Sequence, residues 1–442
     1  MSSLPCQSRR HFLGDLAVAG LSYGTLSSLL AGCSSSTNHS PYDRCGQSQS
    51  PIGKPGLGMP GPFPGRVIEV GHAGAVSQGR RDPVVVRHMV EEGMARLVPE
   101  AESAIDAWRF FFQKGDRIGI KVVPVAMEIR PGANQKYDGP VVDLKRPGSI
   151  SSYELIHAVT EGLVASGIRI SDIMVFERYR DQFVTAGYRE MLPDGAHWEC
   201  ASAFAGNVQL EIDGQKRGER RHRNVAGYDR DVFREMAYCL PPPAHDPTDD
   251  RRFRSHLTNI LTKKVDKVIC LPVLKDHRSA GITMALKNMS HGFVNNVARS
   301  HISRELNQCQ TFIPAAVSLD PTRDKCVLQI LDGLVATYEG GPGTWNPTFA
   351  TWEYNSLLFA TDPVAMDHVG WEILDAKRAQ EGWPSVQKMG LDSVAKKPDD
   401  RSRVPSTEGF HMRQPQHVPL AATLGLGVFE RNRIDHRRVT MA

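Results

Sequence analysis

Residues 263–293 read KKVDKVICLPVLKDHRSAGITMALKNMSHGF, and the rest of the chain is organised around this stretch. Its apolar run at residues 268–271 is typical of a buried strand. Titratable and amide side chains follow within a few turns of chain: Lys275, His277, Lys287, Asn288 and His291. Because α/β proteins build their sites at the carboxyl ends of strands, the stretch predicts both a central strand and a site.

Outward from this stretch, predicted strands and helices alternate. Strands are expected at 66–70, 118–123, 173–176 and 327–331. Apolar residues at helical spacing predict helices over 87–97 and from the capping box at Ser151 to about Gly167. Strand, helix and strand in this order favour right-handed crossovers. The predicted fold class is α/β, with a largely parallel sheet and flanking helices.

The predicted domain organisation has four parts. Residues 1–33 are expected to be a signal peptide, and the Ser-, Pro- and Gly-rich residues 34–65 a linker. Residues 66–435 form the folded domain, within which 187–250 is expected to be an inserted irregular or antiparallel subdomain. Two smaller elements are expected in and after the insertion, an antiparallel strand at 208–212 and a helix over 255–262.

The first 33 residues carry two export signals. Arg9 and Arg10 lie in SRRHFL, which resembles the twin-arginine motif, and LAGC, ending at Cys33, resembles a bacterial lipobox. Together they predict an exported protein that uses the twin-arginine export machinery and is lipid-anchored at Cys33. Its expected location is the periplasmic side of the cytoplasmic membrane or the outer membrane. A transmembrane anchor over residues 13–31 is the alternative, although several glycines and Asp15 make that segment weakly apolar.

Composition limits the possible partners and cofactors. The 442-residue chain has a formal charge of +4, which is too small to indicate a nucleic-acid partner. Its eight cysteines include no CxxC pair and no ferredoxin-like run. The cofactor stays unknown, but a metal is possible because many twin-arginine clients are folded around a cofactor. His277, His291 and His301 are candidate ligands whose spacing matches no standard metal site.

The candidate catalytic residues are Lys275, His277 and Lys287. Lys275 and His277 alternate along the predicted strand and so share a face. A neighbouring lysine favours a neutral imidazole, as a general base or a metal ligand requires. The alternative is that these are loop and helix-end residues with local hydrogen bonds. Four further positions are candidate substrate-binding residues: Asn288, Lys121, Asp332 and Asp367.

From about Val67 to Leu426 the chain resembles the family catalogued as domain of unknown function 362. Five motifs carry the resemblance: DKVI at 266–269, LKDH at 274–277, ALKN at 285–288, Asp332-Gly333 with Gly341-Pro342, and TDPVAMD at 361–367. Some members carry ferredoxin cysteines, and these are missing here. The family's early Lys-Pro-Asn is replaced by Lys121-Val122-Val123-Pro124.

Three functions remain open from the sequence. The first is an enzyme of racemase, epimerase or lyase type that acts on a small anionic molecule, with His277 as acid or base and the two lysines binding an oxyanion. The second is a metal- or iron-sulfur-dependent redox protein. The third is a lipid-anchored solute-binding protein.

Overall fold

The computed structural model describes residues 56–125, 148–204, 209–216, 218, 220–236, 246–300, 308–344, 349–388 and 415–442. The export residues Arg9 and Arg10, the lipidation residue Cys33 and the candidate ligand His301 lie outside these ranges. Among the helices that are described, none has the length and apolarity needed to cross a membrane.

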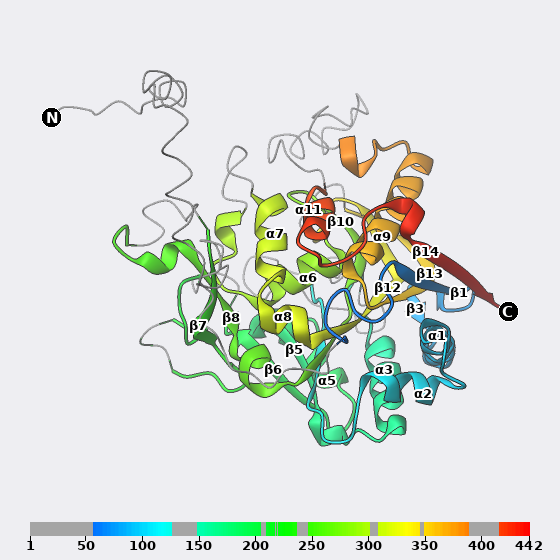
Figure 1. Ribbon diagram of the computed structural model, residues 1–442, viewed down its shortest axis with the longest axis horizontal. Coiled ribbons are helices and arrows are strands. Elements are labelled where there is room, and N and C mark those ends of the chain that lie inside the picture. The colour runs from blue at the N-terminus through cyan, green and yellow to red at the C-terminus, as the bar shows by residue number, and fades with distance from the viewer. Residues whose placement is uncertain are drawn as a thin grey trace, which may run out of the picture. The chain divides into compact units, whose positions relative to one another are not determined.

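A ten-stranded mixed sheet forms the centre of the described structure (Figure 1). Its main path runs β14-β1-β13-β12-β9-β4-β5-β6, and β10 pairs with β12 and β11. The pairs from β12 through β9, β4 and β5 to β6 are parallel, whereas β13 lies antiparallel between β1 and β12. The predicted α/β class with a largely parallel sheet is therefore confirmed. The strands are β1 Arg66–His72, β4 Ile118–Lys121, β5 Ile173–Tyr179, β6 His197–Ser202, β9 Lys267–Cys270, β10 Val273–His277, β11 Gly281–Ile282, β12 Cys326–Glu339, β13 Ala350–Ala360 and β14 Asp435–Met441.

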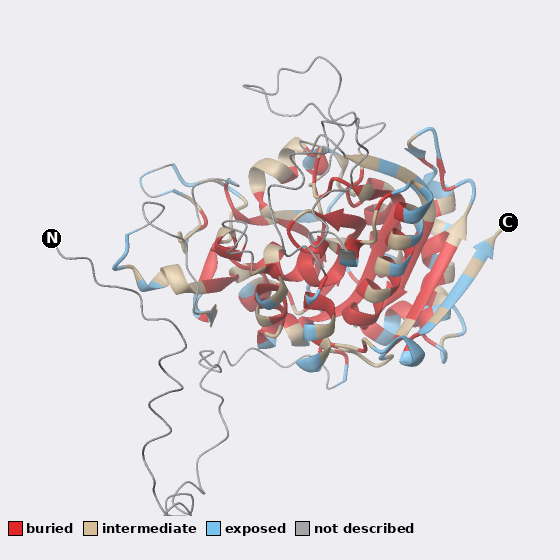
Figure 2. Cartoon of the chain, turned by 90° about the horizontal axis from the view of Figure 1, so that it is seen from above, coloured by how far each residue is buried: buried red, intermediate tan, exposed pale blue. Residues whose placement is uncertain are grey.

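Helices cover both faces of this sheet, and this explains the apolar character of its central strands. Every residue of β4 and β9 is buried, as expected for parallel strands packed on two sides. One hydrophobic core joins the sheet to α1 Pro83–Leu97, α2 Ala104–Phe111 and α3 Tyr153–Ser166. The other core joins it to α6 Met284–Phe293, α7 Cys309–Val317, α9 Pro363–Gln380 and α11 His417–Thr423. Figure 2 shows the buried sheet between exposed outer faces of helices.

The region 187–250 contributes to two sheets. After the short helices α4 Arg180–Thr185 and α5 Tyr188–Met191, β6 extends the main sheet by pairing in parallel with β5. β7 Tyr228–Glu235 pairs antiparallel with β8 Arg254–Thr258 in a separate two-stranded sheet. A second small sheet joins β2 Val76–Ser77 to β3 Arg80–Arg81. The remaining short helix, α8 Asp320–Lys325, leads into β12.

Three local predictions were wrong. Residues 255–262 do not form a helix, because β8 occupies 254–258 and a π-helical turn follows at Ile260–Lys264. Residues 209–212 are turn and bend rather than strand. Helix α3 takes Ser152, not Ser151, as its N-cap, because the Ser151 hydroxyl donates instead to the Leu271 carbonyl at 2.6 Å.

The residues just before β1 pack on the domain. Met59 is buried in the core of α6 and α7, and its backbone N–H donates to the Arg323 carbonyl at 2.8 Å. The Gly65 N–H donates to the carboxylate of Asp362 at 2.9 Å. Asp362 is also the N-cap of α9, with Pro363 at the first helical position. Residues 56–65 are therefore held to the domain by hydrogen bonds and apolar packing.

Candidate active site

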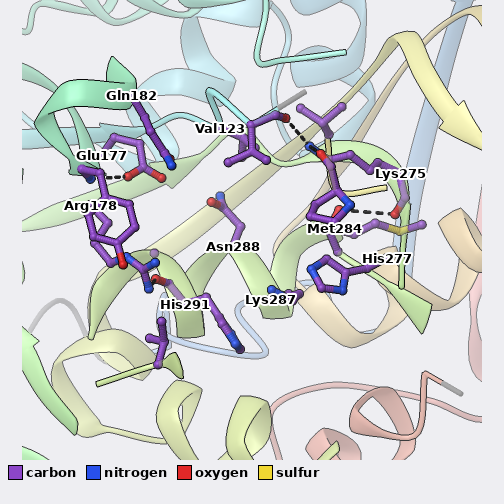
Figure 3. Close-up of a pocket in the computed structure, with 17 residues that line it drawn as sticks. Val123, Glu177, Arg178, Gln182, Lys275, His277, Met284, Lys287, Asn288 and His291 are labelled. Atoms are coloured by element: carbon purple, nitrogen blue, oxygen red, sulfur yellow. Dashed lines mark hydrogen bonds between the residues drawn. The ribbon is translucent and has the colours of Figure 1, made fainter. Parts of the chain in front are cut away.

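A pocket of about 270 Å³ lies where the parallel strands end (Figure 3). The loop after β4, the last residues of β5, the end of β10 and the length of α6 surround it. Its polar lining residues are Glu177, Arg178, Tyr179, Gln182, Lys275, His277, Thr283, Lys287, Asn288 and His291, and its apolar ones include Val123, Val125, Val273, Met284 and Val297. The pocket thus occupies the edge of the sheet where α/β proteins bind ligands.

Lys275 projects from β10 and is almost completely buried. Its ammonium nitrogen donates to the backbone carbonyls of Val125 at 2.6 Å and Pro342 at 3.5 Å. Burial and the nearby charge of Lys287 lower the pKa of Lys275 to about 7, although Asp276 opposes the shift. A large fraction of Lys275 is therefore a neutral amine near physiological pH.

His277 lies two residues further along the same strand and lines the same pocket. Its Nδ1 accepts hydrogen bonds from the backbone N–H groups of Ser279 at 3.0 Å and Ala280 at 3.2 Å. A nitrogen that accepts two such bonds carries no proton, so the neutral ring carries its proton on Nε2. In this tautomer His277 is a proton donor through Nε2–H.

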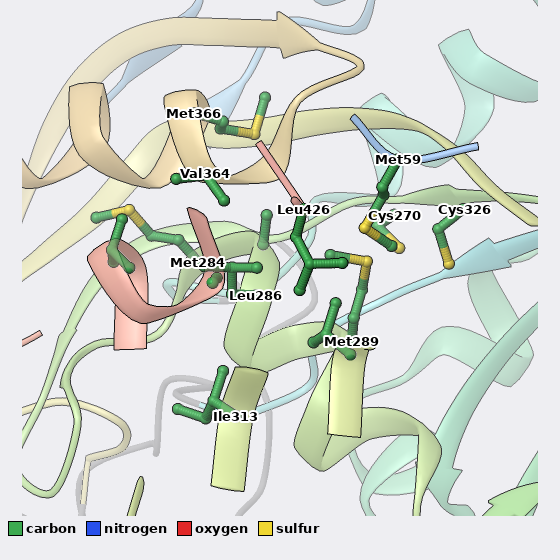
Figure 4. Packing of buried hydrophobic residues seen from close by; sticks show 14 of the residues in the cluster. Met59, Cys270, Met284, Leu286, Met289, Ile313, Cys326, Val364, Met366 and Leu426 are labelled. Carbon is green, nitrogen blue, oxygen red and sulfur yellow. The ribbon is translucent and has the colours of Figure 1, made fainter. Parts of the chain in front are cut away.

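Helix α6 carries three polar lining residues of the pocket on one face and core residues on the other. Lys287, Asn288 and His291 line the pocket. The opposite face packs Leu286 and Met289 among residues of α7, α9 and the C-terminal segment, as Figure 4 shows. Because that face is fixed in the hydrophobic core, the three polar side chains are held at the pocket wall.

Asp367 holds the start of α6 in place. Its two carboxylate oxygens accept hydrogen bonds from the backbone N–H groups of Ala285 at 2.7 Å and Leu286 at 3.0 Å. Asp367 is fully buried and is not a lining residue. Its carboxylate therefore stabilises the helix on which Lys287 and Asn288 stand.

Asp332 stabilises the start of helix α3 in the same way. One of its carboxylate oxygens accepts from the backbone N–H and the hydroxyl of Ser152, at 2.8 and 2.7 Å, where α3 begins. The other accepts from the Leu334 N–H at 3.0 Å. Asp332 lies within β12, which continues past the predicted end at Gly333, and it does not line the pocket.

A buried hydrogen-bond network lies directly behind the pocket wall. Lys121 donates from Nζ to Glu177 Oε1 at 3.1 Å, Asn288 Oδ1 at 2.8 Å and the Val122 carbonyl at 2.8 Å. The Lys121 side chain is completely buried, so Glu177 supplies the negative charge that compensates it. Because an ammonium only donates, Asn288 must direct its oxygen toward Lys121.

The pocket has an excess of positive charge. Arg178, Lys275 and Lys287 line it, and among its described lining residues Glu177 is the only carboxylate. Glu177 is already bonded to Lys121 and to the Tyr179 N–H at 2.8 Å. Burial is the main cause that lowers the pKa of Lys287 to about 8. An anionic ligand would relieve the mutual repulsion of these cations.

The structure brings together four of the seven predicted site residues at the pocket wall: Lys275, His277, Lys287 and Asn288. Lys121 supports them through Asn288, whereas Asp332 and Asp367 support helix starts. Sequence reasoning missed Arg178 and Gln182. The sequence contained a signal for Arg178, since this residue follows Glu177 at the carboxyl end of a correctly predicted strand.

His277 and His291 line the same pocket, but the ring nitrogens of His291 face serine hydroxyls. Its ring nitrogens lie 3.0 Å from the hydroxyls of Ser290 and Ser300. In the described part of the chain, no three His, Cys, Asp or Glu side chains are grouped so that they could hold a metal ion. Cys200, Cys270, Cys309 and Cys326 are buried.

The fold and the pocket together define an α/β protein with a pocket rich in basic side chains at the carboxyl ends of parallel strands. The model of the family described as Domain of unknown function (DUF362) matches residues 238–372, from before β8 into α9. This match supports the resemblance that the motifs indicated, and it includes Lys275, His277, Lys287 and Asn288. No curated protein matches the chain.

Proposed function

We propose that the protein is an enzyme that moves a proton on a small anionic substrate, in the manner of a racemase, epimerase or lyase. The observation that carries this proposal is a single pocket that holds a lysine with a pKa of about 7 beside a histidine with its proton on Nε2. A base tuned near neutral pH and an N–H donor beside it are what proton transfer from carbon requires.

The proposed roles follow from the hydrogen bonds of each group. The neutral amine of Lys275 takes a proton from the carbon next to the substrate's acid group, and the electron pair of that C–H bond moves toward oxygen. The Lys287 ammonium and His277 Nε2–H are among the donors that stabilise the enolate charge on the oxygens of this acid group. Return of the proton to carbon, or loss of a leaving group, completes the reaction.

The proposed location is outside the cytoplasm. The twin-arginine motif at Arg9 and Arg10 and the lipobox cysteine Cys33 support export followed by lipid anchoring. The substrate would then be a small acid in the periplasm.

Proton transfer can be tested without knowing the natural substrate. A panel of small carboxylic acids is incubated with the protein in D2O, and proton NMR follows exchange of the hydrogen on the carbon next to the carboxylate. We expect at least one acid to exchange, with a rate that His277→Gln and Lys287→Gln each lower by about 10²-fold or more. Exchange at the wild-type rate in both variants would contradict the proposal.

A further inference from the structure

Arg178 lines the pocket, and part of its guanidinium makes no hydrogen bond within the described structure. Its Nη1 donates to the His291 carbonyl, and the group lies 4.0 Å over the ring of Tyr179. Among the described residues nothing accepts a hydrogen bond from its buried Nε. Nε and Nη2 form one edge of the guanidinium, and that edge matches two oxygens of one acid group.

Asn288 adds a second donor of the same kind. Its Oδ1 is taken by Lys121, so its Nδ2 must face the pocket side. Nδ2 is buried, and within the described structure it has no hydrogen-bond partner. A buried amide N–H without an acceptor is unfavourable by about 1–3 kcal/mol, and a ligand oxygen would remove that penalty.

The donors favour a carboxylate over a phosphate. Phosphate sites of α/β proteins commonly use backbone N–H groups at the start of a helix. The helix that lines this pocket, α6, has its first free N–H groups bonded to Asp367. The remaining donors are side chains, and the plane of Arg178 is fixed by stacking on Tyr179.

We infer that Arg178 and Asn288 form the binding site for the carboxylate of a short organic acid, whose reacting carbon then lies toward Lys275 and His277. Figure 3 shows Asn288 between Arg178 on one side and Lys275 with His277 on the other. The apolar lining by Val123 and Val125 suits a short hydrocarbon segment. This inference rests on the proposed function for the direction of the substrate, and it adds the substrate class and a specificity-determining residue.

The experiment measures binding of three probes of similar size to the wild-type protein by isothermal titration calorimetry at pH 7.5: butanoate, butanamide and inorganic phosphate. Butanoate is expected to bind at least about tenfold more tightly than the other two, since only it presents a charged planar acceptor pair. Arg178→Lys keeps the charge but loses the planar edge, and it should weaken butanoate binding by about tenfold or more.

The matched control is Arg180→Lys. Arg180 is two residues further on, bonds the Arg223 carbonyl and does not line the pocket, so butanoate affinity should be unchanged. Asn288→Asp provides a second variant of the same shape, in which a new negative charge should abolish butanoate binding. If the thermal unfolding midpoint shows that Arg178→Lys does not fold, the butanoate affinity of Asn288→Asp tests the inference instead.

Three results would overturn the inference: no butanoate binding to wild type, phosphate binding more tightly than butanoate, or unchanged affinity in Arg178→Lys or Asn288→Asp. Failure of the proposed chemistry gives a different pattern. Intact binding without any proton exchange would therefore reject the proton-transfer function and leave the carboxylate site standing.

Discussion

Burial and the nearby charge of Lys287 disfavour the charged form of Lys275, so this residue makes the stability of the protein depend on pH. Its pKa is about 7 in the folded chain, against an ordinary value of 10.5. Between these values the unfolded chain binds a proton that the folded chain has lost, so the free energy of unfolding rises with pH. The unfavourable contribution of Lys275 is complete below pH 7 and is relieved as the pH rises toward 10.5.

Replacing Lys275 with Met should remove this pH dependence. The free energy of unfolding of Lys275→Met, relative to wild type, is expected to fall by on the order of 3 kcal/mol between pH 6 and pH 9.5. Denaturant unfolding at several pH values measures it. Lys114→Met, at an exposed lysine, is the control and should run parallel to wild type. Parallel curves for Lys275→Met as well would show that Lys275 has an ordinary pKa.

The two pocket lysines also predict a narrow pH profile for proton exchange. Lys275 must be neutral to act as a base, so the rate should rise through pH 7. Lys287 must be charged to stabilise an enolate, so the rate should decline above pH 8. NMR exchange rates from pH 6 to 9.5 measure the profile, and Lys287→Gln should lose the decline. A rate that does not change with pH over this range is incompatible with these roles.

At the residue scale, four of the predicted residues line one pocket, whereas the positions of the other three were not predictable. Lys275, His277, Lys287 and Asn288 could be predicted because they cluster within one short stretch. The roles of Asp332 and Asp367 could not, because their partners at Ser152 and Ala285 are distant in sequence. Lys121 was predicted as a substrate-binding residue, and its contact with Asn288 likewise joins segments that are distant in sequence.

Helix α6 is the element that positions half of the pocket, and its start depends on Asp367. Asp367→Ala should leave two buried N–H groups without an acceptor and destabilise the protein by about 1–3 kcal/mol. It should also weaken butanoate binding, because Asn288 stands on the same helix. Thermal unfolding and saturation-transfer NMR measure the two effects.

The matched control is Asp82→Ala at the start of α1. Asp82 accepts from the backbone N–H groups of Val84 and Val85, far in sequence from the pocket residues. Its removal should destabilise the protein by about 0.5–2 kcal/mol and leave butanoate affinity unchanged. Equal losses of affinity in both variants would show that general destabilisation, rather than the position of α6, controls binding.

Elements with apolar runs or strong caps were predictable, and those set by distant partners were not. The cap at Asp362 and the apolar run of β9 needed only local sequence. β8 was mistaken for a helix because its strand character comes from pairing with β7, across an intervening segment. The end of β12 was placed too early because Asp332-Gly333 is a turn signal locally, whereas pairing with β13 carries the strand to Glu339.

For the whole molecule, the proposed export can be tested by fractionation of a bacterial host. Replacement of Arg9 and Arg10 with Lys should leave the full-length protein in the cytoplasm, because the machinery reads the arginine pair. Cys33→Ser should give exported protein that is no longer membrane-bound. Normal membrane attachment in both variants would contradict the lipoprotein proposal.

The pocket also shows why the fold was more predictable than the complete site. A largely parallel sheet follows from alternating strands and helices, which are local patterns. The pocket requires the ends of β4, β5 and β10 to meet, and this depends on pairing between strands that are distant in sequence: Ile118 of β4 pairs with Ile173 of β5 and with Lys267 of β9, the strand that leads into β10. Arg178 comes from β5, outside the residues matched by the family model, and its place at the end of a predicted strand was its one local signal.

Proton exchange by wild type and Lys275→Met, compared in D2O at pH 7.5, shows most directly whether Lys275 is the base. For a carboxylic acid that both proteins bind, we expect wild type to exchange the hydrogen on the carbon next to the carboxylate. Lys275→Met should exchange it about 10²–10⁴-fold more slowly, because the base is gone. Equal rates for the two proteins, or binding without any exchange by wild type, would contradict this role of Lys275.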